Sequence, residues 1–171
     1  NLSEGNFSVA MRYFLPVLAF ALGIALAEIV HKKDLNLLHW RQAAVLVEAL
    51  ILLGVAFFPQ NMNLLANSLT SFACGIQVES FRKIRGNGIA TTMCIGNMRS
   101  GTQNLCNYLQ DRDIENLKKA LLYYGIIICF ICGAIIGNFF IKIFAEKAIL
   151  CCSALLFFAF ILMFIDYERE K

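Results

Sequence analysis

Long apolar runs are the feature that most constrains this chain. Four of them approach the about 20 residues that a helix needs to cross the hydrocarbon core of a bilayer, and they cover residues 13–30, 43–58, 121–141 and 148–165. Hydrophobic residues make up 59% of the chain and charged residues 16%, whereas soluble domains are about 45–50% apolar. The sequence therefore predicts an all-α, polytopic transmembrane helical bundle whose surroundings are the lipid bilayer.

A fifth segment, residues 61–81, is less apolar and carries a polar stripe. On a helical projection, the stripe gathers Asn63, Asn67, Thr70, Ser71 and Gln77 on one side. A polar stripe on a membrane helix normally faces other helices or a wet cavity rather than lipid. We therefore expect a fifth, central span here. The alternative is an amphipathic helix that lies on the membrane surface.

Residues 85–104 interrupt the helical pattern with four glycines and several small hydroxyl and amide residues. Irregular backbone is tolerated at membrane depth only where protein or water satisfies its N–H and C=O groups. We expect a re-entrant or loop segment here, which lines a site or forms a tight structural turn. Residues 104–119 are then expected to form one short amphipathic helix at the membrane interface.

The chain also resembles itself at a constant offset, because the segment from Asn6 aligns with the segment from Asn116. Duplicated and inverted spans are a common architecture of secondary transporters. The second copy is preceded by a long segment of mixed polarity, residues 59–105. We expect an equivalent segment before the first copy. We therefore expect five spans here, within a six-span protein of two inverted three-helix repeats. Both copies carry a helix-packing pair of small residues, namely Gly23 with Ala27 and Gly133 with Gly137.

Lysine and arginine are concentrated in two of the connections between spans. Loops 31–41 and 82–119 carry most of them, and the connection near Pro59 carries none. Cytoplasmic loops are enriched in these residues, so both basic loops are expected in the cytoplasm, with Pro59 and Glu146 outside. This predicts a multi-pass protein of the cell (cytoplasmic) membrane. The net charge of +3 is too small to indicate a nucleic-acid partner.

Glu48 lies near the middle of the second apolar run. A charged side chain at this depth costs about 2.5–3.5 kcal/mol on insertion scales, so such residues are candidates for function. Desolvation favours the neutral form of a carboxyl group, and Glu48 is therefore a candidate for proton coupling. The alternative is a neutral glutamate that is hydrogen-bonded to a neighbouring helix.

A sequence pattern in the fifth segment points to a known family. Asn67, the Ser71-Phe72 pair, Gly75 and Gln77 are followed by a threonine-rich turn at residues 90–97. This pattern resembles the YoaK family, small bacterial integral membrane proteins of about six spans whose activity is unassigned. The chain departs from the family pattern at Val78 and Ile95, where the family has an amide and a hydroxyl residue.

The function expected from these features is secondary transport of a small metabolite. The alternatives are a passive channel, and a non-transporting membrane protein that binds a partner or a lipid. Enzyme motifs are absent from the sequence, and Cys129-x-x-Cys132 has neither a nearby histidine nor a second cysteine pair. We therefore expect no enzyme, no metal and no cofactor. The residues expected to bind the substrate are Asn67, Ser71, Gln77, Thr91, Thr92, Gly96 and Asn97.

Overall fold

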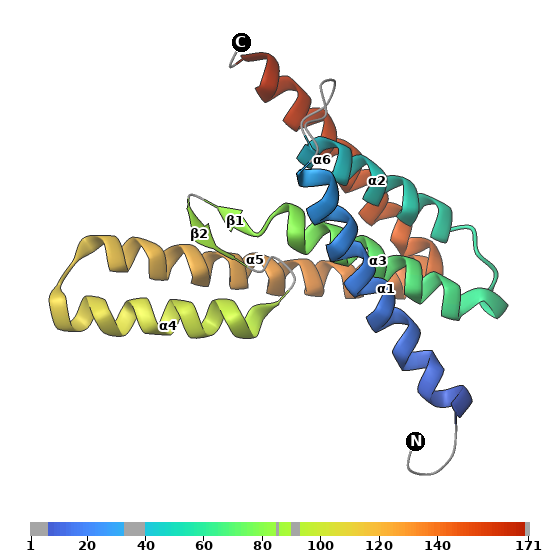
Figure 1. Ribbon diagram of the computed structural model, residues 1–171, viewed down its shortest axis with the longest axis horizontal. Helices are drawn as coiled ribbons and strands as arrows, with labels where there is room; N and C mark the ends of the chain where they lie inside the picture. The colour runs from blue at the N-terminus through green and yellow to red at the C-terminus, as the bar shows by residue number, and fades with distance from the viewer. Residues whose placement is uncertain (1–6, 33–39, 85, 90–92, 170–171) are drawn as a thin grey trace. The chain divides into compact units, whose positions relative to one another are not determined.

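The computed structural model of the chain describes residues 7–32, 40–84, 86–89 and 93–169, and these are almost wholly helical (Figure 1). The all-α class is thereby confirmed, apart from one short hairpin. The chain divides into two compact units, residues 1–80 with 144–171 and residues 81–143. The helices of the first unit are α1 (Phe7–His31), α2 (Trp40–Val55), η1 (Gln60–Met62), α3 (Asn63–Ser80), η2 (Ala145–Ala148) and α6 (Ile149–Arg169).

Helices α1 and α3 approach each other so closely that only glycine fits where they cross. A Cβ atom on Gly23 would overlap the carbonyl oxygen of Phe72, and one on Gly75 would overlap that of Phe20. The two backbones are therefore in direct contact, as in other small-residue crossings between membrane helices. The helices also run in the same direction, because residues 11–12 lie near residues 63–67 and residues 26–30 lie near Ser80.

Helices α2 and α6 run antiparallel and are joined by hydrogen bonds along their length. The start of α2 therefore lies beside the end of α6, and the turns around Gln60 and Glu146 lie at the same end of the unit. The bonds between α2 and α6 are Gln42 Nε2 to Met163 O at 2.9 Å and Ser153 Oγ to Ala49 O at 2.8 Å. A third bond, from Gln60 Nε2 to Glu146 Oε1 at 2.9 Å, joins η1 and η2 at one end of the pair.

The second unit contains a hairpin of β1 (Lys83–Ile84) and β2 (Asn87–Gly88), followed by α4 (Cys94–Asp111) and most of α5 (Ile114–Phe144). Helices α4 and α5 lie side by side (Figure 1). The Thr102 and Tyr124 hydroxyls are 2.9 Å apart between the two helices. The Tyr123 hydroxyl donates to the Gly88 carbonyl at 3.0 Å, so this tyrosine fixes the hairpin against α5.

The expectation of an irregular segment at residues 85–104 is wrong from Cys94 onward. Gly96 and Gly101 lie inside α4, although glycine costs about 1 kcal/mol relative to alanine in a helix. At Gly101 the lack of a side chain lets Tyr123 pack closely against α4, because a Cβ atom there would lie only 3.2 Å from Tyr123 Cβ. This packing offsets the cost of the glycine. The expectation of one helix over residues 104–119 is also wrong, since α4 ends and α5 begins within that range.

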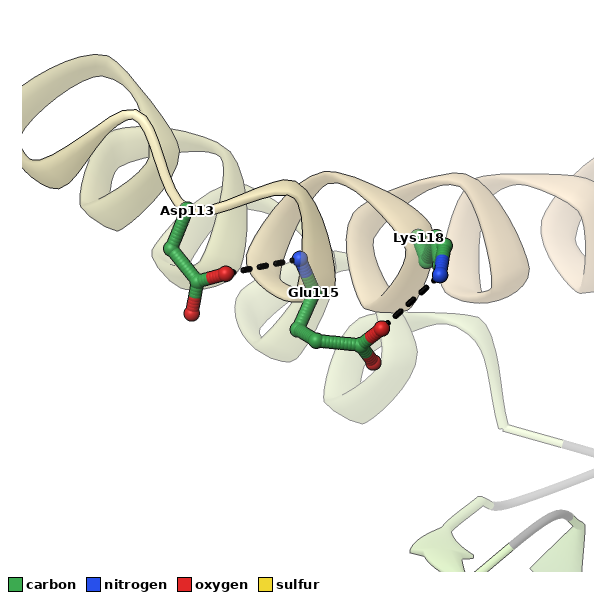
Figure 2. A network of polar contacts seen from close by, with 3 residues as sticks. All are labelled: Asp113, Glu115 and Lys118. Atoms are coloured by element: carbon green, nitrogen blue, oxygen red, sulfur yellow. Dashed lines mark hydrogen bonds and ion pairs between the residues drawn. The ribbon is translucent and has the colours of Figure 1, made fainter.

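The break between α4 and α5 depends on two adjacent residues. Arg112 has a φ of 54° and its N–H donates to the Tyr108 carbonyl, which ends α4. Asp113 then caps α5, because its Oδ1 accepts a bond of 3.0 Å from the Glu115 N–H (Figure 2). Aspartate is among the preferred residues at this position. Glu115 Oε1 in turn accepts a 2.8 Å bond from Lys118 Nζ.

We expect the Arg112→Gly substitution to stabilise the protein by about 0.5–1 kcal/mol. Arg112 adopts a left-handed conformation that glycine occupies without steric cost, and glycine is the usual residue after a helix end. Thermal unfolding in detergent micelles checks this. Asp113→Ala is the opposing variant, and loss of the cap should cost about 1 kcal/mol. A destabilised Arg112→Gly variant would show that the arginine side chain stabilises the turn.

Two helical stretches among the described residues are long and apolar enough to cross a membrane, Val9–His31 and Ile114–Met163. Their mean hydropathies are 2.1 and 2.4, and at most 11% of their most apolar windows is buried. Soluble proteins rarely expose apolar surface of this extent, so the chain is associated with a membrane. The expected spans at 43–58 and 61–81 do not meet the same test, because α2 has only 16 residues and α3 is rich in polar residues.

Candidate functional site

Glu48 is the most deeply buried ionisable group in the described part of the chain. It lies on α2, which packs against both α3 and α6, and 2% of the residue is exposed. Its Oε1 has no hydrogen-bond partner among the described residues. Buried polar atoms are nearly always paired, so an unpaired one calls for an explanation. The alternative expectation is that a neighbouring helix forms a hydrogen bond with Glu48. No described residue forms such a bond with Oε1.

The other buried polar residues of the first unit also surround α2. Gln42, Ser80 and Ser153 are each at most 3% exposed. Gln42 Nε2 and Ser153 Oγ each donate a hydrogen bond to a backbone carbonyl across the contact between α2 and α6. Ser80 Oγ has no partner among the described residues. The sequence analysis missed all three, because a serine or a glutamine near a span has no signal that marks it as buried. We call Gln42, Glu48, Ser80 and Ser153 the polar core.

Helix α3 packs against both α1 and α2, and α2 packs against both α3 and α6, so α3 is one of the two inner helices of the first unit. Its polar stripe is not what it buries, because its buried residues are Ala73, Gly75, Ile76 and Ser80. Asn67 is exposed, and Ser71 and Gln77 are half-buried. Two further hydroxyls of this helix are satisfied locally by carbonyls four residues earlier, Ser68 by Leu64 and Thr70 by Ala66.

A cavity of about 830 Å³ lies where α1 and α3 begin, and Asn67 is part of its wall. We call it the amide cavity, after the side chains that dominate its lining. Its volume is within the usual range of about 300–1,000 Å³ for small-molecule sites. Apart from Met11 and Leu64, it is lined by Arg12, Gln60, Asn61, Asn63 and Asn67.

The remaining residues of the expected substrate site belong to the second unit or lie outside the described residues. Asn97 is 3% exposed and sits on α4 four residues before Gly101. Gly96 is exposed, with nothing within 4 Å of a Cβ placed on it. Thr91 and Thr92 lie outside the described residues. Substrate binding at these positions stays a prediction.

The described part of the chain holds no cluster of three or more histidine, cysteine, aspartate or glutamate residues that could ligate a metal ion. Cys129 and Cys132 are both free and exposed on α5. Glu115 is paired with Lys118 at 2.8 Å on the surface of the same helix.

Comparison with known proteins identifies a family but no activity. No curated protein and no solved structure matches the chain. A family model described as "Protein of unknown function (DUF1275)" matches residues 1–162, which is nearly the whole sequence. The chain belongs to this uncharacterised family, DUF1275.

Proposed function

We propose that this protein is a multi-pass protein of the cell membrane that transports a small metabolite by coupling its movement to protons. Five spans, within a six-span inverted repeat of the YoaK type, are part of this proposal. The exposed apolar surfaces of α1, α5 and α6 support the membrane setting. The basic loops 31–41 and 82–119 would then be cytoplasmic.

The observation that carries the proposal is the buried Glu48 carboxyl group of the polar core, whose Oε1 has no hydrogen-bond partner among the described residues. A carboxyl group buried among packed helices is costly to keep, and no hydrogen bond to Oε1 among the described residues offsets that cost. Such a group has a clear use if it gains and loses a proton during a transport cycle. Proton relays in transporters are built from carboxyl groups of this kind.

The proposed substrate contacts are those expected from the sequence. They are Asn67, Ser71 and Gln77 on α3, Gly96 and Asn97 on α4, and Thr91 and Thr92, which precede α4 in the chain. Uncharged amides and hydroxyls of this kind orient a solute by hydrogen bonds without binding it too tightly to be released.

Proton movement in reconstituted vesicles tests the proposal. Proteoliposomes containing a trapped pH-sensitive dye would be challenged with amino acids, sugars and short carboxylic acids under a pH gradient. We expect at least one solute class to drive proton influx with the unmodified protein. The Glu48→Gln variant should lose this solute-dependent influx, because an amide carries no exchangeable acidic proton at this position.

The matched control is Glu115→Gln, which removes a carboxyl group whose side chain is 64% exposed on α5. This variant should retain full proton influx. Retention of influx in Glu48→Gln would exclude Glu48 as the proton carrier. A steady ionic current without solute would instead support the passive channel, and the absence of any flux would support a membrane protein that binds a partner or a lipid.

A further inference from the structure

The amide cavity adjoins an apolar furrow between α1 and α3. This second cavity has a volume of about 520 Å³. Asn61 and Leu64 line both cavities, so the two share a wall. We call the second cavity the leucine groove, and its other lining residues are Leu15, Leu18, Ala19, Leu22, Met62, Leu65 and Ser68.

The amide cavity favours a negatively charged group. Arg12 is the single charged residue among those that line it, and no acidic residue of the described chain belongs to its wall. Helices α1 and α3 both begin at this end of the unit, and the N-terminus of a helix carries a partial positive charge. A guanidinium group pairs with a carboxylate through two parallel hydrogen bonds.

The amide of Gln60 is already oriented. Its Nε2 donates to Glu146 Oε1 at 2.9 Å, so the carbonyl oxygen of the same amide remains as an acceptor. Glu146 contacts Gln60 and is not part of the cavity lining. The other amides, on Asn61, Asn63 and Asn67, offer N–H donors that complete the hydrogen bonds of a bound carboxylate.

The leucine groove favours an aliphatic chain. Its one hydroxyl, on Ser68, donates to the Leu64 carbonyl at 2.8 Å and is therefore satisfied within α3. Leu15 and Leu22 mark its extent along α1, which is about 10 Å at 1.5 Å per residue. The groove has room for an aliphatic chain of this length, and its leucine side chains match that chain in polarity.

We propose that these two cavities form one binding site for a single-chain amphiphile, with a carboxylate head beside Arg12 and an aliphatic tail in the leucine groove. The inference rests on the proposed function to the extent that it names the class of the transported substrate. Binding at the site does not itself require transport or a proton gradient. One guanidinium balances the single negative charge of a carboxylate, and one groove takes its single tail.

Photolabelling in nanodiscs of phosphatidylcholine tests the site. The probe is decanoate with a diazirine on its chain, and labelled peptides are identified by mass spectrometry. We expect labels on peptides from α1 and from the start of α3, suppressed by unlabelled decanoate and not by decanol. Loss of a charged hydrogen-bond pair costs about 1.5–3 kcal/mol, so Arg12→Gln should weaken competition by decanoate about tenfold or more. Arg12→Lys should weaken it less.

The matched control is Lys147→Gln, which removes one positive charge from η2 at the same end of the unit without touching either cavity. Competition by decanoate should be unchanged in this variant. Equal competition by decanol, or unchanged competition in Arg12→Gln, would overturn the proposal and leave an ordinary lipid-facing furrow. Stronger suppression by phosphatidylglycerol than by decanoate would overturn it in favour of a phospholipid headgroup site.

This experiment separates the inference from the proposed function. Labelling is measured without a pH gradient, so it is independent of Glu48 and of proton movement. Carboxylate-dependent labelling without any solute-driven proton influx would support the site and reject the transporter. Solute-driven influx without labelling of α1 and α3 would support the transporter and reject this site.

Discussion

Replacing Gly75 with alanine is expected to destabilise the first unit by about 3 kcal/mol, the upper end of the usual cost of overpacking. The added methyl group would overlap the Phe20 carbonyl oxygen on α1. The atom it meets belongs to a helix backbone, which cannot move aside as a flexible side chain can. Helices α1 and α3 would have to separate along their contact, with loss of packing at the crossing. Thermal or denaturant unfolding in detergent micelles measures the effect, and Gly23→Ala should behave in the same way.

Gly54 provides the matched control, because it also lies in a helix and has nothing within 4 Å of a Cβ placed on it. Gly54→Ala should be neutral or should stabilise α2 slightly, since alanine is the better helix former by about 1 kcal/mol. If Gly75→Ala were as stable as Gly54→Ala, α1 and α3 would not cross at these glycines.

The Glu48→Leu variant is expected to be more stable than the unmodified protein by about 1–3 kcal/mol. Replacement of a buried ion pair by apolar residues of similar volume is often neutral or stabilising by about 1–4 kcal/mol, and a single buried carboxyl group also carries a desolvation cost. Glu48 is 2% exposed and its Oε1 is unpaired among the described residues, so leucine removes a polar group that the fold does not satisfy. The measurement is again unfolding in micelles, alongside the proton influx assay, in which the variant should be inactive.

Glu48→Gln is the control for this prediction, because it keeps a polar side chain of nearly the same shape and should leave stability almost unchanged. Gain of stability together with loss of activity is the pattern expected where a fold retains a costly group for function. If the Glu48→Leu substitution instead lowered the free energy of unfolding by about 1 kcal/mol or more, the carboxyl group would be stabilising the structure.

The helical class could be predicted from the sequence because its signal is local. Apolar runs near 20 residues long leave few alternatives, and α1, α5 and α6 contain the expected runs at 13–30, 121–141 and most of 148–165. Glu48 was also identified from its position within an apolar run. Residues 94–104 differ from the expectation because the low helix propensity of glycine is a local signal, whereas the packing that allows Gly101 in a helix is not. Tyr123 and Tyr124, which lie beside Gly101, follow it by more than 20 positions in the chain.

The paired small residues show that a local sequence pattern does not predict which helix will be the packing partner. Gly23 with Ala27 and Gly133 with Gly137 are equivalent in sequence. In the structure Gly23 contacts α3, whereas Gly133 and Gly137 have nothing within 4 Å of an added Cβ among the described residues. A small residue permits a close approach, but it does not specify the partner. The partner glycine, Gly75, was read from the sequence only as part of a family pattern.

The sequence by itself determined the helical class, the apolar surface that associates the chain with a membrane, and the presence of a carboxyl group within an apolar run. These depend on composition and on periods of a few residues, which each segment carries alone. Only the tertiary structure decided that Glu48 Oε1 has no partner among the described residues, that the polar core gathers around α2, and that Arg12 and four amides share one cavity. Burial and convergence are properties of several helices packed together, and no single segment encodes them.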